Sequence, residues 1–390
     1  MLKAGYSMWM PSRPLTLQQQ LLRLRAMSML AIAVMAMAGF PAVAQLAPSK
    51  ADGCAVAYSS RGQFAVDVGD IVWHDAVRHR DLPVRILFPR IGMGALIGAS
   101  KSALKGESKG ESKGESMDDS GPETRYPIII FSHGLGGSRE GGALWGQHWA
   151  SHGYIVIHLQ HPGSDESIWK GKRPNEGMAD LQGAMSLDNS RLRTGDVAFA
   201  LDEMARLQAA GVAPFSSANF SRVGMSGHSF GAQTTLTVAG QRLPLQNATG
   251  ATDVRIAAAI AFSPNARVKT GLDTQFAGVT MPVLFITGTR DGSILGDATR
   301  YEDRLLPYEK VPPGNKYLLS FLNGDHMVFG GRALGVRRAE TARDRAIQSG
   351  VKAVTLAFWN ATLKQEGAAK IWLQNEFKSM LVDGDTFAHK

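Results

Sequence analysis

Residues 222–240 read RVGMSGHSFGAQTTLTVAG. The apolar run at 222–226 predicts a buried strand, and residues 232–241 predict a helix. The turn between them, Gly227-His228-Ser229-Phe230-Gly231, sets a serine two positions from a glycine on either side. Such a turn holds the serine in a strained conformation and exposes its hydroxyl at the end of the strand. The stretch therefore predicts a strand–nucleophile–helix unit in which Ser229 is the nucleophile.

Apolar runs alternate with amphipathic stretches on both sides of this unit. Strands are predicted at 71–75, 82–88, 127–132, 154–159, 222–226, 257–262, 283–287 and 316–321, and helices at 143–151, 191–207, 232–241, 297–306 and 340–360. Nearly continuous apolar strands separated by helices are typical of a parallel sheet covered on both faces. The predicted fold class is α/β, with a mostly parallel, doubly wound sheet. Ligands of such sheets bind outside the carboxyl ends of the strands.

A serine nucleophile needs a base, and in this strand order the histidine follows the last strand. Only His326 and His389 come after Ser229 in the chain. His326 directly follows the predicted strand at 316–321, whereas His389 is next to last, where fraying is expected. We therefore predict that His326 is the base.

The third member must accept a hydrogen bond from the histidine ring. Asp291 follows the predicted strand at 283–287 through a short turn, so it is predicted to be this acid. Two alternatives are Asp273, in a loop of uncertain position, and Asp325, which is adjacent to His326 and poorly placed to reach its ring.

The turn after the strand at 127–132 reads Ser132-His133-Gly134-Leu135-Gly136-Gly137. Glycines let the main chain approach a tetrahedral oxygen closely, so the N–H groups of Leu135 and Phe230 are predicted to form an oxyanion hole. Other side chains near this edge of the sheet are predicted to line a substrate pocket: His133, His161, Ser164, Trp169 and His228.

The amino terminus has the pattern of an export signal. Arg23 and Arg25 precede an apolar run at 27–38, and Ala42-Val43-Ala44 offers a small-x-small cleavage site. The run is short for a permanent span, although a signal anchor and a start at Met27 remain alternatives. We predict a cleaved signal peptide at 1–44, a single domain at 45–390 without a stable membrane span, and a bacterial periplasmic or secreted location.

Amino-acid composition and charge further restrict the classes of protein to which the chain can belong. The chain has 390 residues, 44% of them hydrophobic, and a single cysteine, which excludes a disulfide scaffold. Its net charge is +8, but four of the basic residues lie in positions 1–44 and the rest are scattered, so no nucleic-acid partner is predicted.

Residues 98–123, where Lys-Gly-Glu-Ser recurs three times, predict a disordered loop. No cofactor is expected, and no metal, because the histidine pairs at 148/152 and 158/161 lack a third ligand. The oligomeric state stays open.

The motifs together resemble the α/β-hydrolase superfamily over about residues 68–329. The phrases at 131–136 (FSHGLG) and 227–231 (GHSFG) are similar to those of bacterial relatives of platelet-activating-factor acetylhydrolase and of predicted dienelactone hydrolases. The resemblance implies an α/β-hydrolase fold and a catalytic triad of Ser229, His326 and Asp291. In those acetylhydrolases the acid follows the strand next after the nucleophile's, where this chain reads Phe262-Ser263-Pro264. Dienelactone hydrolases use a cysteine nucleophile, so neither name fixes the substrate.

About twenty residues separate the predicted strands at 257–262 and 283–287, which is too few for a large cap domain. We therefore expect a fairly open crevice and an exported serine hydrolase of carboxylic esters, with short acyl chains or accessible esters in a small molecule, lipid or polymer. An acyltransferase, amidase or peptidase would share the acyl-enzyme half-reaction and stays an alternative. A non-catalytic binding protein that retains the fold is another.

Overall fold

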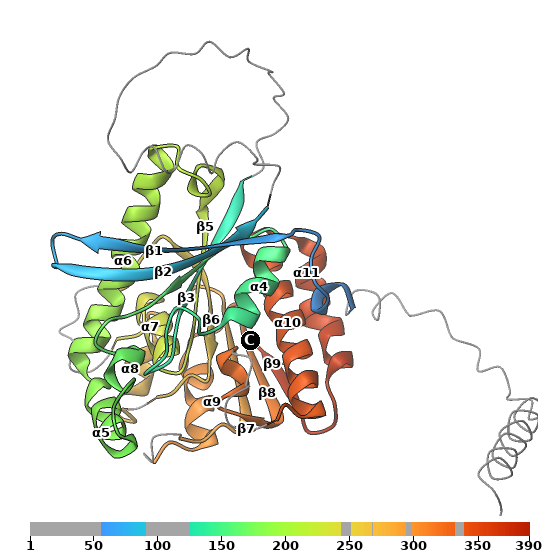
Figure 1. Cartoon of the computed structure of the whole chain (residues 1–390). Coiled ribbons are helices and arrows are strands. Elements are labelled where there is room, and N and C mark those ends of the chain that lie inside the picture. The colour runs from blue at the N-terminus through green and yellow to red at the C-terminus, as the bar shows by residue number, and fades with distance from the viewer. Residues whose placement is uncertain (1–55, 91–124, 243–250, 267, 294–297, 332–338) are drawn as a thin grey trace, which may run out of the picture. The chain divides into compact units, whose positions relative to one another are not determined.

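The residues described by the computed structural model form one sheet of nine strands, in the order β1-β2-β4-β3-β5-β6-β7-β8-β9 (Figure 1). The neighbouring strands from β4 to β8 in this order are parallel, and the pairs β1–β2, β2–β4 and β8–β9 are antiparallel. The strands are β1 (Val66–Asp75), β2 (Arg80–Pro89), β3 (Tyr126–Ser132), β4 (Ile155–Leu159), β5 (Ala218–His228), β6 (Ile256–Phe262), β7 (Val283–Arg290), β8 (Lys316–Asp325) and β9 (Thr386–His389). The predicted fold class is confirmed.

The structure describes residues 56–90, 125–242, 251–266, 268–293, 298–331 and 339–390. All of them lie within one unit, Ser49–Lys390. The predicted signal peptide at 1–44 and the predicted disordered loop at about 98–123 lie outside these ranges.

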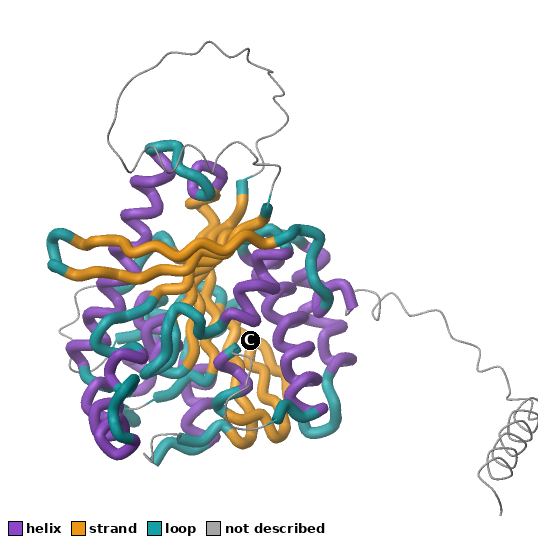
Figure 2. The backbone as a smooth tube through the Cα atoms, viewed as in Figure 1, coloured by secondary structure: helices purple, strands orange, loops and turns teal. Residues whose placement is uncertain are grey.

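Helices lie on both faces of the sheet (Figure 2). The α-helices are α4 (Ala143–Ser151), α5 (Pro174–Ala184), α6 (Leu187–Ala209), α7 (Phe230–Val238), α8 (Leu272–Phe276), α9 (Tyr301–Lys310), α10 (Ala342–Thr362) and α11 (Gly367–Ile371). Successive side chains of a strand point to opposite faces. In β3, Ile129 and Phe131 accordingly pack in the cluster that contains α4 and α10, and Ile128 and Ile130 in the cluster that contains α6.

In the carboxyl-terminal region the structure differs from the prediction for His389. His389 is not frayed: it lies in β9, opposite Tyr317 at the start of β8. His326 follows the other end of the same ten-residue strand, so roughly 25–30 Å of extended chain separates the two histidines. His389 is thus far from the end of the sheet where the predicted nucleophile lies, because β9 pairs with the start of β8 and not because the terminus is frayed.

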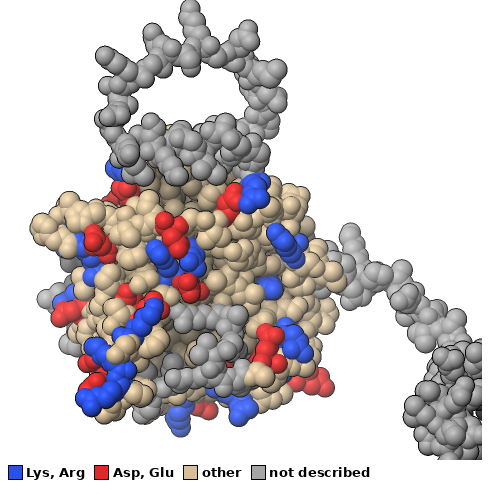
Figure 3. Space-filling model, in the orientation of Figure 1, with Lys and Arg blue, Asp and Glu red and all other residues tan. Residues whose placement is uncertain are grey.

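Surface charge and helix hydropathy add two observations. On the face shown in Figure 3, basic and acidic side chains are interspersed. Among the described helices, none combines the length and the apolar character needed to cross a membrane.

Candidate active site

Ser229 occupies the turn between β5 and α7. Its backbone has φ 56° and ψ −115°, a conformation that residues with a side chain rarely adopt. A Cβ atom at Gly227 would lie 2.3 Å from the carbonyl oxygen of Gly231, and one at Gly231 would lie 1.9 Å from the carbonyl oxygen of Ser132. Both glycines of the motif are therefore required by the close packing of this turn. The Ser229 side chain is half-buried.

His326 and Asp291 meet beside this turn. The ring Nδ1 of His326 lies 2.7 Å from Oδ1 of Asp291, and both side chains are buried. Thr287 in β7 donates its hydroxyl to the other carboxylate oxygen over 2.8 Å. With Nδ1 committed to Asp291, Nε2 is the ring nitrogen that can exchange a proton with another group.

Asp291 stays ionised over a wide pH range. Burial alone would raise the pKa of its carboxyl, but the hydrogen bond from His326 and the charges of His326 and Arg304 outweigh burial and lower the pKa to about 2. Arg304, from α9, is itself buried and places Nε 3.4 Å from Oδ1 of Asp291. It also donates to the backbone carbonyl of Ser263 over 2.9 Å, which ties the ends of β6 and β7 together.

His228 links the histidine loop to the serine turn. Its Nε2 lies 2.9 Å from the carbonyl oxygen of His326, and the two rings are 4.6 Å apart. Burial lowers the pKa of His228 to about 3, so the ring is neutral and Nε2–H is the donor. Because His228 directly precedes Ser229, this bond brings the loop of His326 next to the nucleophile turn.

The loop after β3 lies against the same turn. A Cβ atom at Gly134 would lie 3.4 Å from the Cβ of Ser229. The N–H of Gly136 donates to the carbonyl of Ser164, and the N–H of Gly137 donates to that of Gly134. Leu135, between these positions, is half-buried. Phe230 is the first residue of α7, and the first N–H groups of a helix have no partner within it.

The side chains predicted to line a pocket occupy two different environments. His133, His161 and Ser164 are at most 1% exposed, so they lie beneath the loop after β3 and do not face a crevice. For example, the backbone N–H of His161 donates to the ring Nε2 of His133. Trp169 is 39% exposed, and its indole N–H donates to the carbonyl of Gly136 over 2.7 Å. Of the predicted pocket residues, Trp169 is therefore the one at the surface.

A second serine–histidine–aspartate arrangement lies inside the protein. The hydroxyl of Ser132 is 2.9 Å from Nε2 of His161, and Nδ1 of His161 is 2.9 Å from Oδ2 of Asp196. All three side chains are fully buried. Arg80 also donates to both carboxylate oxygens of Asp196. A substrate cannot reach this serine without unfolding its surroundings, so the arrangement acts as a structural network. The three residues lie far apart in the sequence, so no local pattern predicted their arrangement.

The alternative acids hold other partners. Asp325 accepts the N–H groups of Met327 and Val328 and so shapes the turn that carries His326. Asp273 pairs with Lys310 at the surface.

Of the four paired histidines, His161 bonds the side chains of Ser132 and Asp196, and the other three bond backbone carbonyls. His148 and His152 bond the carbonyls of Tyr58 and Ser60, and His158 bonds that of Gly141. Within the ranges that the structure describes, no cluster of three or more His, Cys, Asp or Glu side chains is arranged to hold a metal ion.

Sequence comparison adds one finding. Residues 100–179 match the family model of platelet-activating factor acetylhydrolase, isoform II. The match confirms the predicted resemblance, and it spans the loop after β3 but not Ser229, Asp291 or His326. It supports a hydrolase of the lipase or esterase type. No curated protein matches the chain.

Proposed function

We propose that the chain is a serine hydrolase of carboxylic esters. Ser229 is the nucleophile, His326 the general base and acid, and Asp291 the residue that orients His326. The N–H groups of Leu135 and Phe230 form the oxyanion hole. The observation that carries the proposal is the buried 2.7 Å hydrogen bond between His326 and Asp291 next to a strained serine turn.

The chemistry follows from this arrangement. Nε2 of His326 accepts the hydroxyl proton as Ser229 Oγ attacks the ester carbonyl carbon, and the carbonyl oxygen becomes an oxyanion. Collapse of the tetrahedral intermediate breaks the bond to the alkoxy oxygen, which leaves as an alcohol with the proton from His326. Water then attacks the acyl-enzyme with His326 again as base, releasing the carboxylic acid and restoring Ser229.

The substrate is an ester with a short or accessible acyl group. The segment between β6 and β7 spans only residues 263–282 and contains the five-residue helix α8, which is too little chain for a cap domain. An acyltransferase, amidase or peptidase would pass through the same acyl-enzyme, and a panel of ester, amide and alcohol acceptors separates them. Export to the periplasm or medium remains part of the proposal, and cell fractionation tests it.

A fluorophosphonate probe tests the mechanism directly, because it labels only an activated serine. We expect labelling of the purified protein to be lost in Ser229→Ala. Ser132→Ala is the matched control: its serine also sits beside a histidine–aspartate pair, but it is buried, so labelling should persist. Labelling that survives Ser229→Ala would overturn the assignment of Ser229 as the nucleophile. Absence of labelling in the unaltered protein would overturn the proposal and favour a binding protein that retains the fold.

A further inference from the structure

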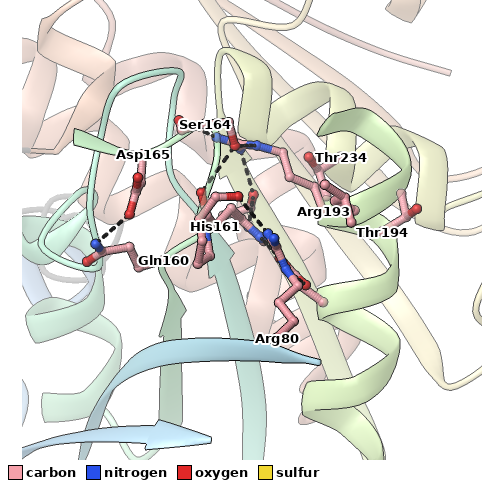
Figure 4. Close-up of polar contacts among 12 residues, drawn as sticks. Arg80, Gln160, His161, Ser164, Asp165, Arg193, Thr194 and Thr234 are labelled. Atoms are coloured by element: carbon pink, nitrogen blue, oxygen red, sulfur yellow. Dashed lines mark hydrogen bonds and ion pairs between the residues drawn. The ribbon is translucent and has the colours of Figure 1, made fainter. Parts of the chain in front are cut away.

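Arg193 is a charged side chain with no exposed surface, and the proposed mechanism does not use it. It comes from α6 and reaches under the loop after β3. Its Nε donates to the hydroxyl of Ser164 over 2.8 Å, as Figure 4 shows, and its Nη1 donates to the carbonyl of His133 over 2.7 Å. Its guanidinium lies 4.3 Å from the ring centroid of Phe230. One side chain thus contacts the loop after β3, the loop after β4 and the first residue of α7.

These contacts end next to the two peptides that carry the oxyanion donors, at the carbonyl of His133 and at the ring of Phe230. Arg193 holds the carbonyl of His133, and the His133 ring Nδ1 in turn lies 2.6 Å from the carbonyl oxygen of Gly134. The carbonyl of Gly134 and the N–H of Leu135 belong to one planar peptide, so fixing the oxygen also fixes the direction of the N–H. Phe230, which stacks on Arg193, supplies the other donor.

The charge of Arg193 is compensated only at a distance. Within the part of the chain that the structure describes, its hydrogen bonds go to hydroxyl and carbonyl oxygens, its Nη2 lies 3.5 Å from Nδ1 of His133, and none of these contacts is to a carboxylate. Arg80, by contrast, bonds both oxygens of Asp196. Burial lowers the pKa of Arg193 to about 9, against the opposing effect of Asp196 and Asp165, so the guanidinium is a cation at neutral pH. A fixed cation at this place favours negative charge in the oxyanion hole.

Building on the proposed function, we propose that Arg193 is the positioning residue of the oxyanion hole: its planar fork fixes the Leu135 and Phe230 donors, and its charge stabilises the oxyanion that they bind. Such a residue acts on the transition state more than on the bound substrate. Its loss should therefore lower kcat and leave KM nearly unchanged.

The test compares Arg193→Met and Arg193→Lys with the matched control Arg80→Met. Arg80→Met removes a cation from the same network without touching the loop after β3. On p-nitrophenyl acetate we expect kcat to fall about 10²-fold in Arg193→Met, with KM within about threefold, as for loss of an oxyanion donor. Arg193→Lys keeps the charge without the fork and should lose about tenfold. Arg80→Met should lower the unfolding temperature but keep kcat within about threefold.

Affinity for a trifluoromethyl ketone, which forms an oxyanion on Ser229, separates positioning from a general structural role. It should fall in parallel with kcat in both Arg193 variants and stay unchanged in Arg80→Met. If Arg193→Met does not fold, Arg193→Lys alone decides: unchanged kcat and ketone affinity there would overturn the inference. An active parent protein with a fully active Arg193→Met would overturn this inference alone. A parent protein with neither ester turnover nor probe labelling would overturn the proposed function as well.

Discussion

Replacing Asp291 by asparagine would leave His326 facing Arg304 without a carboxylate between their charges. Nη2 of Arg304 lies 3.3 Å from Nδ1 of His326, and Oδ1 of Asp291 lies 2.7 Å from the same nitrogen. The proposed mechanism protonates the His326 ring in the transition state. The ring then becomes a cation held between one negative and one positive neighbour.

The two distances give the sizes of these effects. At an effective dielectric constant of about 20, the attraction between Asp291 and a protonated His326 is about 6 kcal/mol, and the repulsion from Arg304 is about 5 kcal/mol. The attraction of the Asp291 carboxylate for the protonated His326 ring is thus about as large as the repulsion of that ring by Arg304. Losing about 6 kcal/mol corresponds to roughly a 10⁴-fold drop in kcat, so Asp291→Asn should be nearly inactive.

Removing Arg304 relieves this repulsion in both backgrounds, but in the parent protein it also removes an ion pair. There Arg304→Met loses the 3.4 Å pair between Arg304 Nε and Asp291 Oδ1 that helps to hold the carboxylate against His326, so kcat should not rise. In Asp291→Asn it removes the uncompensated cation, so the double variant should exceed the single variant in kcat by at least about tenfold. Steady-state hydrolysis of p-nitrophenyl acetate at pH 8 measures all four proteins. A double variant no faster than Asp291→Asn would refute the electrostatic account of this pair.

Three further predictions concern packing, pH and substrate. Gly231→Ala should destabilise the fold by about 3 kcal/mol or more in urea unfolding, because its Cβ would lie 1.9 Å from Ser132 O; Gly183→Ala, with nothing within 4 Å, is the control and should not destabilise it. Burial lowers the pKa of His158 to about 4, so the unfolded chain binds this proton below about pH 6.5 and the folded chain does not. Stability should therefore fall by about 1.4 kcal/mol per pH unit between about pH 6 and 4.5 from this ring alone, and urea midpoints of His158→Gln should show a correspondingly smaller slope. p-Nitrophenyl acetate and butyrate should be hydrolysed faster than palmitate, and a palmitate preference that rises at an oil surface would contradict the open crevice.

The central strands and most of the helices could be predicted because their signals are local. An apolar run bounded by turn residues determines a buried parallel strand, and α4 occupies the predicted residues 143–151. By contrast, α5 was missed because it contains few apolar residues, and only Gly177 and Ala184 in it are buried. The short strand β9 was missed because its stability comes from pairing with β8, which the local sequence does not encode.

In the candidate site, too, the residues that local motifs mark were predicted, and those that depend on contacts between distant segments were not. Ser229, Asp291 and His326 were placed from motif and strand order, and the structure brings Asp291 and His326 together. The roles suggested for Arg193 and Arg304 depend on contacts between distant segments. A signal for Arg193 was present: it lies four positions before Val197 and eight before Leu201, both buried in α6, so it falls on the apolar face of the helix. An arginine at such a position needs buried partners.

The buried Ser132–His161–Asp196 arrangement matters for anyone who searches structures for enzymes. A template search that scores only distances between hydroxyl, imidazole and carboxylate would return this interior trio with 2.9 Å at both steps. Such a template does not ask whether a substrate can reach the serine. It also does not ask whether a hydrogen-bond donor is placed to stabilise the negative charge that develops on the substrate's carbonyl oxygen. Screening criteria for hydrolases gain more from adding these two terms than from tightening the distance tolerance.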